Sequence, residues 1–234
     1  MNFLPLLALA TTVTTSQVAD VAEFRRPLVQ LFEAEWPKNR TVNIVCHGHS
    51  VPAGYFKTPI VQTFDAYPHL LHLAIKGAYP KAVVNVIVTA IGGEHSESGA
   101  KRFSHDVLSL RPDVVTIDYS LNDRGIGLDR AKAAWEEMIV SAKKANVKVI
   151  LLTPSWDLTV NAANLNDPLH LHAQQVRDLA RKHGVGLADT FNAFLQTSRS
   201  GKSFDSLMSQ ANHPNREGHK LIVRELSPWF GVTN

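Results

Sequence analysis

Apolar residues along this chain follow two different spacings in alternation. Short unbroken runs rich in Val and Ile are typical of strands buried on both faces of a parallel sheet. Between them, apolar residues recur every three or four positions, as on one face of a helix. Strands are predicted over residues 43–46, 83–88, 114–117, 147–152 and 185–187. Helices are predicted over residues 21–36, 67–78, 96–108, 129–145, 168–183, 190–196 and 216–226.

Residues at the ends of these segments support the assignment. Asp129 is expected to cap the helix that follows it, and Asn215 is expected to cap the last helix. Gly184 is expected to end the helix over residues 168–183. Strands that alternate with helices imply right-handed crossovers, so the fold class is α/β, with three layers and a doubly wound parallel sheet. In such sheets ligands bind at the carboxyl ends of the strands.

Polar side chains suited to one reaction follow several of these strands. Ser50 follows the first strand, Asn122 follows the third, and His213 lies near the C-terminus. A serine, an amide and a histidine match the nucleophile, oxyanion donor and base that acyl transfer requires. The pair Gly92-Gly93 follows the second strand and offers a backbone N–H as a further oxyanion donor. We expect Ser50 to lie in an exposed turn, because Gly, Pro and Ser cluster around it.

In these stretches the chain resembles the SGNH/GDSL hydrolase superfamily, from about residue 41 to about residue 229. The first block of that family normally reads Gly-Asp-Ser, and here it is Gly48-His49-Ser50, followed by Gly54. The Gly-x-Asn-Asp block is here Ser120-Leu121-Asn122-Asp123. The Asp-x-x-His-Pro block is here Gln210-Ala211-Asn212-His213-Pro214. Each block is weak alone, but their joint order and spacing make the resemblance specific.

The resemblance implies a five-stranded, flavodoxin-like sheet of order 2-1-3-4-5 and a serine esterase that works through an acyl-enzyme. Ser50 would be the nucleophile and His213 the base, with Gly93 and Asn122 in the oxyanion hole; Gly92 is the alternative to Gly93. Asp123 is expected to brace its own loop. Many such relatives deacetylate carbohydrates, and others cleave lipids or thioesters. The expected substrate is therefore a carbohydrate or other small ester, and no cofactor is implied.

Three departures from the family pattern are His49 for Asp, Ser120 for Gly and Gln210 for the Asp of the triad. A neutral amide does not stabilise an imidazolium as a carboxylate does. His213 would therefore be oriented by Gln210, by Asp205 or Asp157, or by a backbone carbonyl in a Ser-His dyad. His49 either tunes the local field or satisfies a hydrogen bond. The missing Asp also admits a second class, a ligand-binding relative with weak catalysis, although the intact Ser50, Asn122 and His213 favour the enzyme.

Length and composition exclude several other classes. The 234 residues suit one domain, with an N-terminal segment over 1–40 and the hydrolase domain over 41–234. The net charge of +3 is small and dispersed, so nucleic acid is not an expected partner. Cys46 is the one cysteine and lies in an apolar strand, which predicts a buried, inert thiol. The close pairs of histidines, such as His69 and His72, lack the spacing of zinc sites, so no metal is expected.

The N-terminus allows two interpretations. The apolar run over residues 3–10 resembles the h-region of a signal peptide within a signal-like stretch over 1–19, with a cleavage pattern at residues 8–10. No Lys or Arg precedes that run, which favours a segment packed on the domain. Export to the periplasm or medium is slightly favoured over a cytoplasmic location. No run approaches the roughly 18 apolar residues of a transmembrane helix.

Overall fold

The protein contains a five-stranded parallel sheet in the predicted order. The structure is a computed structural model and describes residues 17–233, so the apolar run over residues 3–10 lies outside the described residues. The strands are β1 (Val42–Gly48), β2 (Val84–Val88), β3 (Val114–Asp118), β4 (Lys148–Leu152) and β5 (Gly186–Ala188). They are hydrogen-bonded in the order β2-β1-β3-β4-β5, and every neighbouring pair is parallel. The α/β fold class and the strand order are therefore confirmed.

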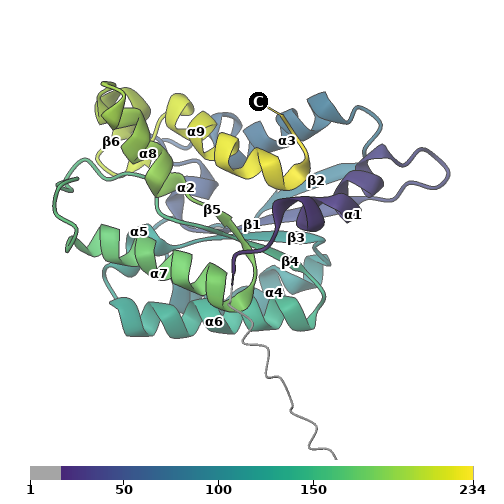
Figure 1. Ribbon diagram of the computed structural model, residues 1–234, viewed down its shortest axis with the longest axis horizontal. Coiled ribbons are helices and arrows are strands. Elements are labelled where there is room, and N and C mark those ends of the chain that lie inside the picture. The colour runs from purple at the N-terminus through teal and green to yellow at the C-terminus, as the bar shows by residue number, and fades with distance from the viewer. Residues whose placement is uncertain (1–16, 234) are drawn as a thin grey trace, which may run out of the picture.

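Helices cover both faces of this sheet and make three layers (Figure 1). One layer holds α1 (Val21–Glu33), α3 (Tyr67–Ala78), α8 (Thr190–Arg199) and α9 (Arg216–Leu226). The other holds α4 (Ser96–Asp106), α6 (Leu128–Lys144) and α7 (Pro168–His183). A separate apolar core lies on each side, with Phe32 and Leu71 in one and Trp135 and Ile139 in the other. Burial on both faces explains why the strands are continuous apolar runs.

Most of the helix caps predicted from the sequence are found in the structure, and one is not. The bounds of α3, α7 and α9 are those predicted. Gly184 ends α7 with φ of 60°, and the Asn215 side chain accepts hydrogen bonds from the first turn of α9. The prediction that Asp129 caps α6 is wrong, because the helix begins at Leu128 and Asp129 lies in its first turn. Its cap position is Gly127, at φ of 80°, a backbone conformation that glycine adopts without steric cost.

Several short elements carry no periodic signal and were not predicted. They include the one-turn helices α2 (Ser50–Ala53) and α5 (Ser120–Asp123), and a hairpin of β6 (Met208–Gln210) and β7 (His213–Pro214). Four 3₁₀ turns complete the described elements: η1 (Thr63–Asp65), η2 (Leu108–Leu110), η3 (Phe204–Leu207) and η4 (Ser227–Phe230). Among residues 17–233, none of the helices combines the length and apolar character needed to cross a bilayer.

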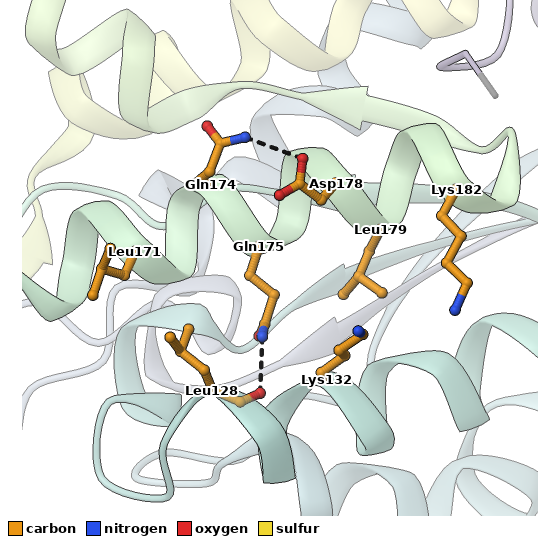
Figure 2. A pocket seen from close by; sticks show the side chains of 8 residues that line it. All are labelled: Leu128, Lys132, Leu171, Gln174, Gln175, Asp178, Leu179 and Lys182. Carbon is orange, nitrogen blue, oxygen red and sulfur yellow. Dashed lines mark hydrogen bonds between the residues drawn. The ribbon is translucent and has the colours of Figure 1, made fainter. Parts of the chain in front are cut away.

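A surface cavity of about 390 Å³ lies between α6 and α7 (Figure 2). Its polar side chains are partly paired with each other and with the backbone. Gln175 Nε2 donates to the Leu128 carbonyl at 2.8 Å, and Gln174 Nε2 donates to Asp178 Oδ1 at 3.1 Å. None of the residues predicted for the catalytic site lines this cavity.

Candidate active site

The strand order places Ser50 between the two loops that carry the predicted oxyanion donors. Strand β1 lies between β2 and β3, and Ser50 follows β1 directly. The loop with Gly93 follows β2, and Asn122 follows β3. Because parallel strands end at the same edge of the sheet, the three residues converge there. The sequence therefore predicted correctly that these three residues share one edge of the sheet.

Ser50 is the first residue of the short helix α2, not part of an exposed turn. Its exposed fraction is 6%, so the expectation of exposure is wrong. The next two residues of the helix, Val51 and Pro52, are also buried, so most of α2 packs into the protein interior. Gly54 closes the turn in a left-handed conformation at φ of 90°, and its N–H donates to the Ser50 carbonyl at 3.0 Å. A glycine is required at position 48, because a Cβ there would lie 2.4 Å from the Asp118 carbonyl oxygen.

His213 reaches Ser50 from the β6–β7 hairpin. Its Nε2 lies 2.9 Å from Ser50 Oγ, and its Nδ1 lies 3.2 Å from the Phe56 carbonyl oxygen. A carbonyl only accepts, so Nδ1 must carry the ring proton and Nε2 is left with the lone pair that faces the serine. The ring is buried, and burial lowers the pKa of His213. At neutral pH His213 is therefore a neutral base in contact with Ser50.

The three side chains considered as partners of His213 bond elsewhere. Gln210 Oε1 accepts from the Thr58 N–H at 2.9 Å, although Gln210 is paired with His213 across the hairpin. Asp205 is exposed and accepts from the Ser203 hydroxyl at 2.9 Å. Asp157 pairs with Arg124 at 2.6 Å and also accepts from Thr159. Of the alternatives, a backbone carbonyl is the one that the structure brings to Nδ1.

The side chain of Asn122 is held against the loop that carries Gly93. Its Nδ2 donates one hydrogen bond to the Glu94 carbonyl at 2.9 Å and has a second hydrogen to offer. Gly93 has φ of 79°, and a Cβ there would meet no heavy atom within 4 Å. At Gly92 a Cβ would lie 2.7 Å from the ring of Tyr55. Gly93 is thus required for its backbone conformation and Gly92 for the close approach of an aromatic ring.

Buried polar contacts brace both loops from behind. Asp123 accepts from the Ser96 N–H at 2.8 Å and from Trp135 Nε1 at 2.7 Å, in agreement with the structural role predicted for it. The carboxylate of Glu94 pairs with Arg102 and accepts from the Tyr119 hydroxyl at 2.8 Å. The loop that carries Gly93 is therefore fixed at Glu94 by its side chain as well as by its carbonyl.

Sequence reasoning missed Tyr55 as a residue of the site. Its ring centroid lies 5.8 Å from that of His213, and the same ring lies against Gly92. Tyr55 therefore packs between His213 and the loop after β2. The one signal available was its place next to Gly54, at the end of the first block.

His49, which stands where the family normally has Asp, is completely buried. Its Nδ1 accepts from the Val51 N–H at 3.2 Å and lies 3.4 Å from Ser50 Oγ. The side chain therefore caps the first turn of α2, so the hydrogen-bonding alternative for His49 is the one seen. Cys46, also as predicted, is fully buried, and burial raises the pKa of its thiol to about 12.

Comparison with known proteins identifies the family. The model of the GDSL-like lipase/acylhydrolase family matches residues 46–221, which include the strands β2 to β5 and the predicted site residues. The chain belongs to this family. Family membership, together with a buried Ser-His pair at the carboxyl edge of the sheet, makes it a serine hydrolase that acts on ester bonds.

Individual relatives are distant in sequence and close in fold. An acetylxylan esterase of Geobacillus stearothermophilus is 24% identical over 169 residues, which cover 64% of this chain and 74% of that protein. The crystal structure of Axe2, an acetylxylan esterase from the same organism, superimposes with a TM-score of 0.72 at 19% identity, over 82% of this chain and 95% of that one. LAE5, an alpha/beta hydrolase from the metagenome of Lake Arreo, gives a TM-score of 0.71 at 20% identity, over 87% and 99%.

Proposed function

We propose that this protein is a carbohydrate acetyl esterase in which Ser50 is the nucleophile and His213 the general base. The observation that carries the proposal is the contact of 2.9 Å between His213 Nε2 and the buried Ser50 Oγ. This contact lies at the sheet edge, between the loops that hold Gly93 and Asn122.

The reaction follows from these positions. Ser50 Oγ attacks the ester carbonyl while its proton passes to His213 Nε2. The backbone N–H groups of Ser50 and Gly93 and the side chain of Asn122 stabilise the oxyanion. His213 then gives the proton to the departing sugar hydroxyl. Water, deprotonated by the same ring, releases the acyl group as a carboxylic acid and restores Ser50.

Two observations favour a short acyl group on a sugar. The ring of Tyr55 packs against both Gly92 and His213, beside the reacting groups, and we infer that it limits the length of the acyl chain. In addition, the curated relative and one of the matched crystal structures are acetylxylan esterases by name.

The test compares acetylated xylooligosaccharides with p-nitrophenyl esters of increasing chain length. We expect release of acetate from the oligosaccharides and a steep fall in kcat/KM as the acyl chain of the p-nitrophenyl ester grows. Efficient hydrolysis of long-chain esters with no release from acetylated sugars would contradict the carbohydrate assignment.

The role of Ser50 has its own test. Ser50→Ala should abolish hydrolysis and labelling by a fluorophosphonate probe without changing the melting temperature. Ser227→Ala is the matched control, because Ser227 is equally buried but lies after α9, where its hydroxyl bonds the Val223 carbonyl. Undiminished turnover in Ser50→Ala would remove Ser50 as the nucleophile. A wild-type protein that fails to label would instead support a ligand-binding relative.

A further inference from the structure

Next to Ser50 the protein buries a second imidazole together with a carboxylate. The side chains of His49 and Asp118 are both almost completely buried, and His49 Nε2 lies 3.4 Å from Asp118 Oδ1. Neither of these two atoms makes a hydrogen bond, to the other or to any other group among residues 17–233, so each is the nearest polar partner open to the other. A buried carboxylate oxygen normally accepts a hydrogen bond, and the donor that faces this one is the histidine ring.

The sheet itself brings the two residues together. Gly48 and Asp118 are aligned partners at the ends of β1 and β3. The His49 N–H donates to the Asp118 carbonyl oxygen at 3.2 Å, which fixes the backbones of both residues. Their side chains are therefore placed by the register of the central strands and not by a surface loop.

Two other ionisable side chains near Asp118 carry no positive charge. Cys46 and Tyr67 are both fully buried, and burial raises the pKa of the thiol and of the phenol, so both are neutral. His49 is thus the neighbour whose N–H can stabilise this carboxylate.

The contacts on the other side of the His49 ring determine its tautomer. Nδ1 accepts the Val51 N–H at 3.2 Å, so Nδ1 must carry a lone pair. The ring proton of the neutral form then lies on Nε2, the ring nitrogen that is 3.4 Å from Asp118 Oδ1. Nδ1 also lies 3.4 Å from Ser50 Oγ. A single tautomer therefore presents an N–H to the carboxylate and a lone pair to the first turn of α2, where Ser50 is the first residue.

We propose that Asp118 is a positioning residue that acts through His49: it holds His49 as the Nε2–H tautomer, and His49 Nδ1 in turn holds the first turn of α2, which carries Ser50. The proposal rests on the proposed role of Ser50 as nucleophile. It accounts for a carboxylate in the site that does not touch His213.

The first test is a double-mutant cycle on turnover of p-nitrophenyl acetate. An amide at position 118 can donate as well as accept, so Asp118→Asn no longer dictates the tautomer. We expect kcat to fall by about 10- to 100-fold, as for a small displacement of a reacting group, with KM nearly unchanged. His49→Asn keeps an oxygen that can cap α2 but has no tautomer to set. In that background Asp118→Asn should therefore cost less than about twofold.

Thr116→Val is the matched control. Thr116 is buried two residues before Asp118 on β3, and its hydroxyl has no hydrogen-bond partner among the described residues. This variant removes a buried polar group without touching the pair, so kcat should stay near the wild-type value. If Asp118→Asn lowers kcat by the same factor with and without His49, then Asp118 does not act through His49 and the proposal is overturned.

The second test observes the tautomer directly and needs no turnover. In protein labelled with ¹⁵N-histidine, ring-nitrogen NMR should show His49 with Nε2 protonated and Nδ1 unprotonated; His49→Asn identifies the signal. A proton on Nδ1 in the wild type overturns the proposal, even if Asp118→Asn does not fold. Ser50→Ala should keep the same signal. Retained turnover in Ser50→Ala would therefore refute the proposed function while leaving the tautomer assignment intact.

Discussion

The carbonyl oxygen of Phe56 lies 3.2 Å from Nδ1 of His213, in the place where a triad carboxylate would stand. The same oxygen accepts a hydrogen bond from the Ser209 hydroxyl at 2.9 Å. The Phe56 N–H donates to the Ile60 carbonyl at 3.0 Å, so the backbone of Phe56 is held at both its N–H and its carbonyl. His213 is thus oriented by a neutral dipole that is itself held in place, and none of the carboxylates in residues 17–233 bonds the ring.

The pH dependence of the enzyme should reflect this environment. Burial lowers the pKa of His213 below its usual value of 6.5, while the hydrogen bond to the Phe56 carbonyl opposes that shift. Since His213 must be neutral to accept the serine proton, a lower pKa keeps it active at lower pH. The acidic limb of the kcat/KM profile should therefore lie below pH 6.5. A limb above that value would contradict this account.

Gln210 can be tested as a site for a restored carboxylate. Gln210 faces His213 across the β6–β7 hairpin, so Gln210→Asp places a carboxylate beside the ring. A negative charge favours the charged ring, so the pKa of His213 should rise, the acidic limb should move to higher pH, and kcat should increase. The measurement is the pH–rate profile of wild type and variant. An unchanged limb would show that the new carboxylate does not reach His213.

Gln210→Ala tests whether the native amide matters to catalysis. It removes the bond to the Thr58 N–H but none to His213, so kcat/KM should change by less than about threefold, the effect of one modest hydrogen bond. Asp205→Ala and Asp157→Ala provide comparison variants. A collapse of activity in Gln210→Ala, with no loss in the two aspartate variants, would make Gln210 the working third member.

Asn122→Ala should remove one oxyanion donor. We expect kcat to fall by roughly 10²–10³ with little change in KM, because the interaction strengthens only as the oxyanion forms. The lost bond to the Glu94 carbonyl is shared with the loop of Gly93, so the melting temperature is measured in parallel. An effect on KM alone would instead assign Asn122 to substrate binding.

The two neighbouring glycines should respond differently to a methyl group. In Gly92→Ala the new Cβ would lie 2.7 Å from Tyr55 and push that ring toward His213, so kcat/KM should fall by about tenfold. Adding Tyr55→Ala should restore part of that loss. Gly93→Ala meets no atom but is strained at φ of 79°, by about 1–2 kcal/mol, and Tyr55→Ala should not relieve it. Equal rescue of both variants would contradict the distinction.

The parts of this site that depend on side-chain chemistry could be predicted from the sequence, whereas the parts that depend on the path of the backbone could not. Ser50, Asn122 and His213 are recognisable because their chemistry lies in their side chains, and the sheet brings them together as expected. The helices of many turns were also predictable from their spacing. The strands β6 and β7 of the hairpin are too short to show an alternation of apolar and polar residues in the sequence. Asp118 lies at the end of an apolar strand, and its closeness to His49 follows from strand register, which the sequence does not display.

The use of a peptide carbonyl to orient His213 changes what mutation can do to this enzyme. Every amino acid at position 56 would supply the same oxygen, so no single codon change there can delete the group that a triad aspartate would provide. The orientation of His213 depends instead on the residues that fix the backbone path of the loop. One of them is Ser209, whose hydroxyl donates to that oxygen. A substitution that reshapes this loop could therefore misplace His213 while leaving both Ser50 and His213 unchanged in sequence.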